Sequence, residues 1–216
     1  MAQLQITRFG GVEVLQLANQ ELTAPASGEV LLDVIYAAVN PVDAKTRAGL
    51  GWAAAQHKDD LPWTPGFDVC GLVQAVGASV TDFAVGQRVC GMVFRGGAYA
   101  SHLLALADDV LPVPETISSE QAAALPLAGL TAWQGLFEHG QLQAGETVLI
   151  SAAAGGVGHI AVQLAKQAGA KVIASASASN HAFLRELGAD QVVDYHDSDA
   201  MAALNGQLDL VFDLVG

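Results

Sequence analysis

The stretch TVLISAAAGGVGHIAVQLAKQAGAKVIAS, residues 147–175, decides the fold of the second half of the chain. An apolar run at 147–151 leads into a glycine-rich turn, a helix predicted over 159–167 and a second apolar run at 171–175. A glycine-rich turn between a strand and a helix is the context in which such a turn indicates dinucleotide binding. The stretch therefore predicts a parallel strand–helix–strand unit.

The turn matches the pattern G-x-G-x-x-G at Ala153, Gly155 and Gly158, with alanine in place of the first glycine. Gly155 would let a pyrophosphate approach the backbone, and Gly158 would let the helix pack closely on the strand. Phosphate would lie on free N–H groups at the positive end of the helix. The predicted cofactor-binding residues of the turn are Ala154, Gly155, Gly156, Val157 and Gly158. A tight turn without a ligand is the alternative.

Strands and helices continue to alternate up to the end of the sequence. Helices are predicted over 182–187 and 197–204, and apolar strands over 191–194 and 208–214. This alternation indicates a parallel sheet covered on both faces. Doubly wound dinucleotide folds have the strand order 3-2-1-4-5-6, of which the first four are present here. The last strand would be an apolar edge, so we interpret the chain as a fragment, or as one whose edge is covered by something else.

The N-terminal half has a different pattern. Short runs rich in Val, Leu and Ile are separated by Gly, Pro and Asp, which predicts the strands and turns of a β-barrel or sandwich. Ser118 and Gln121 form a predicted capping box that opens a helical stretch, broken at Pro126 and ending at Gly140. The sequence therefore predicts two domains, 1–118 and 119–216.

Composition excludes several classes of protein. With 216 residues, 52% hydrophobic and 14% charged, the chain is too apolar to be disordered. Nine Lys and Arg against 22 Asp and Glu give a net charge of −13, which repels nucleic acid and anionic membrane surfaces. Two cysteines, Cys70 and Cys90, cannot build a disulfide framework, and no stretch predicts a signal peptide or a spanning helix. We expect a cytoplasmic protein without nucleic-acid or membrane partners.

The segment after the second strand predicts which cofactor is bound. An acidic residue there, ~20 residues after the turn, would bind the ribose 2′-hydroxyl of NAD. Residues 174–181 are instead ASASASNH, whose hydroxyl and amide groups can hydrogen-bond a 2′-phosphate, with positive charge from His181 and Arg185 nearby. The predicted cofactor is NADPH, bound here by Ser175, Ser177, Asn180 and His181. The alternative for the serines is a solvated loop and a helix N-cap.

Several further segments resemble the medium-chain dehydrogenase/reductase superfamily. They are AVNPVDAKTRAG at 38–49, PGFDVCG at 65–71, VGQRV at 85–89, GAYA at 97–100 and LAGLTAW at 127–133. The resemblance covers essentially the whole chain and is closest to the zinc-free quinone oxidoreductases and the alkenal and enone reductases. It implies an α/β protein with a GroES-like β-barrel domain and a Rossmann doubly wound sheet, here truncated. The family is typically homodimeric, but its usual interface strand is absent from this chain.

The resemblance also implies that no metal is bound. Zinc-dependent alcohol dehydrogenases have a cysteine ligand where this chain has Asn40, and a His–Glu pair where it has Phe67 and Asp68. Cys70 and Cys90 fall on apolar strand positions, and two thiols without a paired histidine do not make a tetrahedral zinc site. Hydride addition to a conjugated acceptor does not need a Lewis acid, because hydrogen bonds can stabilise the charge that develops on oxygen.

The catalytic residues that the resemblance implies are Asn40, Lys45 and Tyr99. Asn40 would bond the nicotinamide ribose or the substrate oxygen, Lys45 would hold an oxygen or donate a proton, and Tyr99 would line the cleft. Their structural alternatives are an Asn-Pro turn, a surface lysine and a packed aromatic. Thr131 would contact the nicotinamide end of the cofactor, with a backbone-bonded helix threonine as the alternative, and Tyr195 would lie over its adenine side.

The predicted function is NADPH-dependent, zinc-independent reduction of quinones or α,β-unsaturated carbonyls by hydride transfer. The cofactor would carry the hydride, while the protein orients the substrate, excludes water and provides a proton. An enoyl-thioester reductase of the same superfamily is the nearest enzymatic alternative. A protein that binds NADPH for a structural or interaction role, without turnover, is the alternative from another class.

Overall fold

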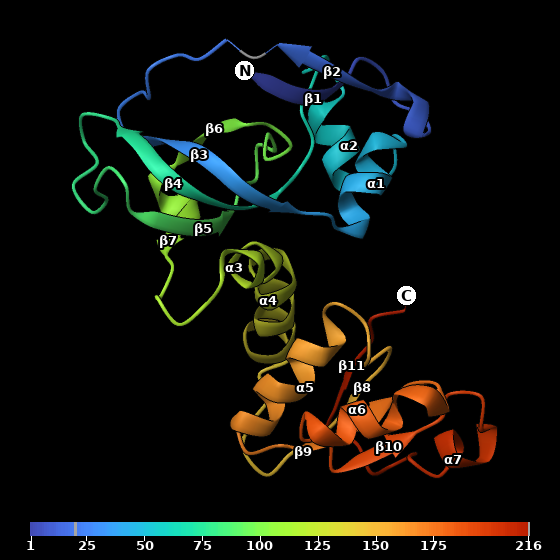
Figure 1. The fold of residues 1–216 in the computed structure, drawn as a ribbon. Coiled ribbons are helices and arrows are strands. Elements are labelled where there is room, and N and C mark those ends of the chain that lie inside the picture. The colour runs from blue at the N-terminus through green and yellow to red at the C-terminus, as the bar shows by residue number, and fades with distance from the viewer. Residues whose placement is uncertain (20, 216) are drawn as a thin grey trace. The chain divides into compact units, whose positions relative to one another are not determined.

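The computed structural model describes residues 1–19 and 21–215. They form two compact units, Met1–Leu127 and Ala128–Gly216 (Figure 1). The predicted domain boundary, between residues 118 and 119, precedes helix α3 (Ser119–Ala124). This helix belongs to the first unit because its Ala122 and Ala123 are buried against Cys70.

The first unit is built on a five-stranded antiparallel sheet with the order β6-β3-β4-β5-β7. Its strands are β3 (Glu29–Ala38), β4 (Asp68–Val76), β5 (Arg88–Met92), β6 (His102–Leu106) and β7 (Val110–Pro112). A separate hairpin pairs β1 (Ala2–Ile6) with β2 (Leu15–Asn19), and single 3-10 turns lie at Val12–Val14 and Ala107–Asp109. Val30, Leu32 and Val89 are fully buried in the core of the sheet. The predicted β-rich first domain is confirmed.

Two short helices interrupt this unit, α1 (Pro41–Arg47) and α2 (Gly51–His57). The sequence interpretation of this half as strands and turns was wrong for these residues. Each helix has seven residues, which is too short for an apolar repeat to stand out. Pro41 at the first position, after Asn40 as N-cap, was the available signal.

The second unit contains a four-stranded parallel sheet with the order β10-β9-β8-β11. The strands are β8 (Thr147–Ile150), β9 (Lys171–Ser175), β10 (Gln191–Val193) and β11 (Leu210–Phe212), and the connecting helices are α5 (Gly158–Gln167), α6 (His181–Glu186) and α7 (Ser198–Ala202). In order of sequence this is 3-2-1-4, as predicted. Val148 and Ile150 join one core cluster while Leu149, between them, joins another, so the sheet is buried on both faces.

The helical stretch before this sheet also follows the prediction. Ser118 and Gln121 exchange hydrogen bonds of 3.1 and 3.3 Å between backbone N–H and side-chain oxygen, which confirms the capping box. Helix α4 (Pro126–Trp133) continues as a π-helical turn at Gln134–His139. Within the part of the chain that the structure describes, no helix is long and apolar enough to cross a membrane.

Strand β11 is shorter than the predicted run of 208–214. It lies at one edge of the four-stranded sheet and pairs with β8. Val211 on this strand is 53% exposed. The Ser151 hydroxyl donates to Asp213 at 2.6 Å and accepts from the Leu214 N–H at 2.7 Å, which fastens the chain after β11 to the end of β8.

Candidate functional site

Gly158 lies where α5 comes closest to the end of β8. A Cβ atom at this position would be 2.5 Å from the carbonyl oxygen of Ala152 and 2.6 Å from the Cα of Ala153. Both are backbone atoms that cannot move aside without displacing the turn. Only glycine therefore allows this helix to begin so close to the strand.

The other two glycines of the turn border open space. A Cβ atom on Gly156 would meet no atom within 4 Å, and one on Gly155 would meet only the Ala152 carbonyl oxygen, at 3.1 Å. The Ala153 N–H donates to the Ser175 carbonyl at 3.0 Å, which ties the turn to β9. Since the N–H groups in the first turn of a helix have no partner inside it, this exposed side of the turn fits an anionic group such as a pyrophosphate.

The residues predicted to bind a 2′-phosphate divide into one buried residue and one loop. Ser175 is 3% exposed at the end of β9. Ser177, Asn180 and His181 follow in a single 3-10 turn, Ala178–Asn180, and the start of α6. Asn180 Nδ2 donates to Ser177 Oγ at 3.1 Å, and His181 Nε2 lies 3.1 Å from the Ala176 carbonyl oxygen. The loop therefore gathers hydroxyl, amide and imidazole groups in one place.

A carboxylate that sequence reasoning missed faces this loop. Asp194 follows β10 and accepts hydrogen bonds from the His196 N–H at 3.0 Å and from the His196 ring at 2.9 Å. These bonds, with a further one from the Ala178 N–H, lower the pKa of Asp194, so it remains ionised beside the loop. Tyr195 is 54% exposed, and its ring lies 4.1 Å from that of His196. The acid that selects NAD is expected after the second strand, whereas Asp194 follows the third, β10.

In the first unit, Asn40 joins two buried carboxyl groups. Its N–H donates to Asp43 Oδ2 at 2.7 Å, and its Nδ2 donates to Asp68 Oδ2 at 2.9 Å. The other oxygen of Asp68 accepts from the Leu127 N–H at 2.8 Å. Asp43 is 3% exposed and Asp68 is fully buried. In the sequence, Asp68 is flanked by Phe67 and Val69, which was an available signal that this acid needs a partner, whereas Asp43 lies near Asn40, Lys45 and Arg47 and gave no such signal.

Burial controls the protonation of this cluster. It raises the pKa of Asp68 to about 6, against hydrogen bonds from Asn40 and Leu127 that lower it. It also raises the pKa of Asp43. Burial and the neighbouring Asp43 charge raise the pKa of Tyr99 far above its usual range, so its phenol stays protonated. Tyr99 can therefore donate a hydrogen bond but cannot act as a base.

Tyr99 is held against the strand-forming backbone of the first unit. Its hydroxyl donates to the Ala38 carbonyl at 3.3 Å. Its ring covers Gly66, where a Cβ atom would lie 2.5 Å from the ring and where φ is +98°, a conformation suited to glycine. The structure thus brings Asn40 and Tyr99 together around Asp43.

The remaining predicted residues lie elsewhere. Lys45 is exposed on α1, and Thr131 is exposed on α4 in the second unit. Cys70 and Cys90 are paired across β4 and β5 as free thiols, and burial raises the pKa of both. Among the described residues, no three His, Cys, Asp or Glu side chains are grouped so that they could hold a metal ion. The absence of zinc stays a prediction.

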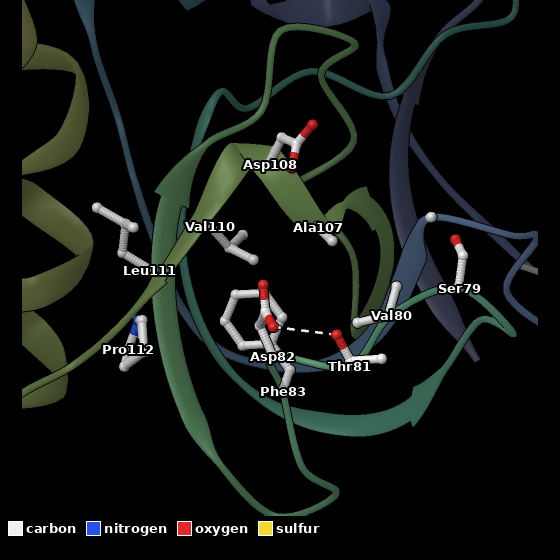
Figure 2. A pocket seen from close by; sticks show the side chains of 11 residues that line it. Ser79, Val80, Thr81, Asp82, Phe83, Ala107, Asp108, Val110, Leu111 and Pro112 are labelled. Atoms are coloured by element: carbon white, nitrogen blue, oxygen red, sulfur yellow. Dashed lines mark hydrogen bonds between the residues drawn. The ribbon is translucent and has the colours of Figure 1, made fainter.

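A separate pocket of about 560 Å³ lies in the first unit, between residues 79–83 and 107–112 (Figure 2). Phe83 and Val110 provide apolar surface, and Asp82, which accepts from the Thr81 hydroxyl at 3.1 Å, and Asp108 provide negative charge. None of the predicted site residues lines this pocket.

A GroES-like β unit, followed by a parallel sheet whose first strand leads into a glycine-rich turn, defines a medium-chain dehydrogenase/reductase. Residues 26–115 match the family model of the alcohol dehydrogenase GroES-like domain, and residues 156–216 match that of the zinc-binding dehydrogenases. The chain belongs to the medium-chain dehydrogenase/reductase superfamily and to its quinone oxidoreductase-like members.

Individual relatives agree with this assignment. The chain is 37% identical over 201 residues to a quinone oxidoreductase of Mus musculus, covering 92% of this chain and 60% of the relative. It is 38% identical over 220 residues to an NADPH-dependent alkenal/one oxidoreductase, chloroplastic, of Arabidopsis thaliana, covering 96% and 55%. The structure of the quinone oxidoreductase from Coxiella burnetii matches with a TM-score of 0.92 and 41% identity, covering 100% of this chain and 69% of that one. The chain thus spans about 60% of the length of the curated relatives that it matches.

Proposed function

We propose that this protein is an NADPH-dependent, zinc-independent reductase of quinones or α,β-unsaturated carbonyls. The observation that carries the proposal is the turn at Gly155–Gly158, where open space borders the N-terminus of a helix that begins against a strand. Two relatives are named as a quinone oxidoreductase and as an NADPH-dependent alkenal/one oxidoreductase, which supports the choice of substrate class.

Two groups of residues in the second unit would hold the cofactor. The turn would bind the pyrophosphate through backbone N–H groups beside Gly156. Ser177, Asn180 and His181 would bind the 2′-phosphate through their hydroxyl, amide and imidazole groups, on a loop whose Ala178 N–H donates to Asp194. When bound, the nicotinamide supplies the hydride.

The buried cluster of the first unit would act on the substrate side of the reaction. Hydride addition to a conjugated carbonyl places negative charge on its oxygen, which hydrogen-bond donors stabilise. The second hydrogen of the Asn40 amide nitrogen is such a donor, since the first is directed at Asp68. The Tyr99 hydroxyl stays protonated but donates its one hydrogen to the Ala38 carbonyl, so it would reach a substrate oxygen only by exchanging that bond. The proton that completes the reduction would come from Lys45 or from water. We also propose a cytoplasmic location, which two free thiols at Cys70 and Cys90 support.

The test is a titration with NADPH and NADH, followed by the decay of nicotinamide absorbance with a quinone and an enal. We expect the lower dissociation constant for NADPH, and His181→Ala should weaken NADPH binding while leaving NADH binding unchanged. His139→Ala, at an exposed position of the same unit, is the matched control. Equal dissociation constants for NADPH and NADH would refute the proposed preference for NADPH. Binding without turnover across the substrate panel would favour a non-catalytic role.

A further inference from the structure

Asp68 is a fully buried carboxylate that accepts from two different elements. Its Oδ2 accepts from Asn40 Nδ2 at 2.9 Å, just before α1. Its Oδ1 accepts from the N–H of Leu127 at 2.8 Å, the second residue of α4. One side chain at the start of β4 therefore holds Asn40 and binds the first turn of a helix.

Only an acceptor at both oxygens satisfies these two donors. An ionised carboxylate has no hydrogen to donate, whereas an amide presents one oxygen and one NH₂ group. With an amide at position 68, one of the two N–H donors would face another donor. An ionised Asp68 therefore requires that the nitrogen end of the Asn40 amide is turned toward it. Asn40 is held from the other side by α1, because its N–H donates to Asp43 at 2.7 Å.

We propose that Asp68 is the positioning residue of the reductase site, because it fixes which end of the Asn40 amide faces β4 and which atoms remain for the ligand. The statement that Asn40 binds a cofactor or substrate rests on the proposed function. The hold on Asn40 is a property of the first unit alone and can be tested without turnover.

Protonation of Asp68 would release this hold. A protonated carboxyl group has one donor and cannot accept from both Asn40 and Leu127 in the same way. The titratable groups that face it are Asp43 from α1, Tyr99, and Cys90 from β5. Burial raises the pKa of both Tyr99 and Cys90, which keeps these two groups neutral, so of the three neighbours only Asp43 can be ionised beside Asp68. The pKa of Asp68, raised by burial to about 6, places the release in an accessible pH range.

The first experiment follows the side-chain ¹⁵N amide resonance of Asn40 and the carboxyl ¹³C resonance of Asp68 between about pH 4.5 and 8. Both should titrate with the same midpoint, near pH 6. Asp68→Asn should abolish the titration of the Asn40 amide, and Asp59→Asn, at an exposed acid, should leave it unchanged. An Asn40 resonance that does not move, or that titrates with a midpoint different from that of Asp68, would overturn the proposal. The wild-type titration decides this even if the variant does not fold.

The second experiment asks whether the hold matters for catalysis. We expect Asp68→Asn to lower kcat for NADPH oxidation by about tenfold with a smaller change in KM, and to remove the acid limb of the pH profile. In Asn40→Ala, the further substitution Asp68→Asn should cost little, because the group that it positions is gone. Additive losses, or a wild-type kcat in Asp68→Asn, would overturn a positioning role. If the wild-type protein shows no turnover, the proposed function fails, while the resonance titration still decides the hold on Asn40.

Discussion

The turn between β8 and α5 contains two glycines at which substitution by alanine should have different effects on stability and on cofactor binding. At Gly158 the new methyl group would lie within 2.7 Å of three backbone atoms of Ala152 and Ala153. At Gly156 it would meet no atom within 4 Å. Gly158→Ala therefore tests the packing of α5 on the sheet, and Gly156→Ala tests the open space in which we place the pyrophosphate.

Two effects oppose each other in Gly158→Ala. Overpacking against rigid neighbours typically costs about 1–3 kcal/mol. Alanine in a helix gains up to about 1 kcal/mol over glycine, and Gly158 is the first residue of α5. Because the clashing atoms are all backbone, we expect the clash to win, with a net loss of about 1–2 kcal/mol. Each kcal/mol corresponds to about 4–8 °C in Tm for a unit of this size.

Urea unfolding of both variants and of the wild-type protein measures this difference. Gly156→Ala should unfold within about 0.5 kcal/mol of the wild type and yet bind NADPH about tenfold more weakly, a difference of about 1.4 kcal/mol. If Gly158→Ala is as stable as the wild type, the close approach of α5 to β8 is not as described. If Gly156→Ala binds NADPH as the wild type does, the pyrophosphate does not lie at this turn.

Three further outcomes are expected. The pKa of Asp68 is about 6 in the folded protein against a reference value of 3.8, so the folded state binds this proton more tightly than the unfolded state does. The resulting contribution to the free energy of unfolding, roughly 3 kcal/mol, is complete below about pH 4 and is lost as the pH rises through 6. The difference in unfolding free energy between the wild type and Asp68→Asn should show this dependence on pH, and a difference that is constant with pH would contradict it. Elemental analysis should find no stoichiometric metal, and a chelator should leave activity unchanged; activity that returns only with added zinc would refute this. Val211→Lys should reduce self-association in sedimentation experiments, because a charge on the exposed edge strand β11 opposes pairing with another chain. A wild-type protein that is already a monodisperse monomer would show that this edge does not drive association.

The second unit was predictable in detail because its signals are local. Apolar strands alternating with helices predicted the parallel sheet, and the strand order typical of doubly wound dinucleotide folds predicted 3-2-1-4. The predicted strand at 171–175 agrees with β9 at both ends, and the helix predicted over 159–167 agrees with α5 to within one residue. The last elements were overestimated: the strand predicted over 208–214 is only β11, Leu210–Phe212, and the helix predicted over 197–204 is only α7, Ser198–Ala202, since an apolar run does not show where strand pairing or a helix ends.

The candidate site was less predictable because its decisive contacts join distant segments. Asn40 meets Asp68 across 28 positions, and Asp68 meets Leu127 across 59. A sequence shows that an acid is present but not that it is buried, and burial is what raises the pKa of Asp68. Asp194 was missed for the same reason, because parallel pairing of β9 and β10 brings it to the loop after β9.

We propose above that the turn at Gly155–Gly158 binds NADPH for hydride transfer to a quinone or an enal. The most direct test is a titration of the wild-type protein and Gly156→Ala with NADPH, read by tryptophan fluorescence and followed at once by absorbance decay with a quinone. Saturable binding that Gly156→Ala weakens, together with oxidation of NADPH by the quinone, is the predicted result. No saturable binding, or binding that is the same in both proteins, would show that this turn does not hold the cofactor.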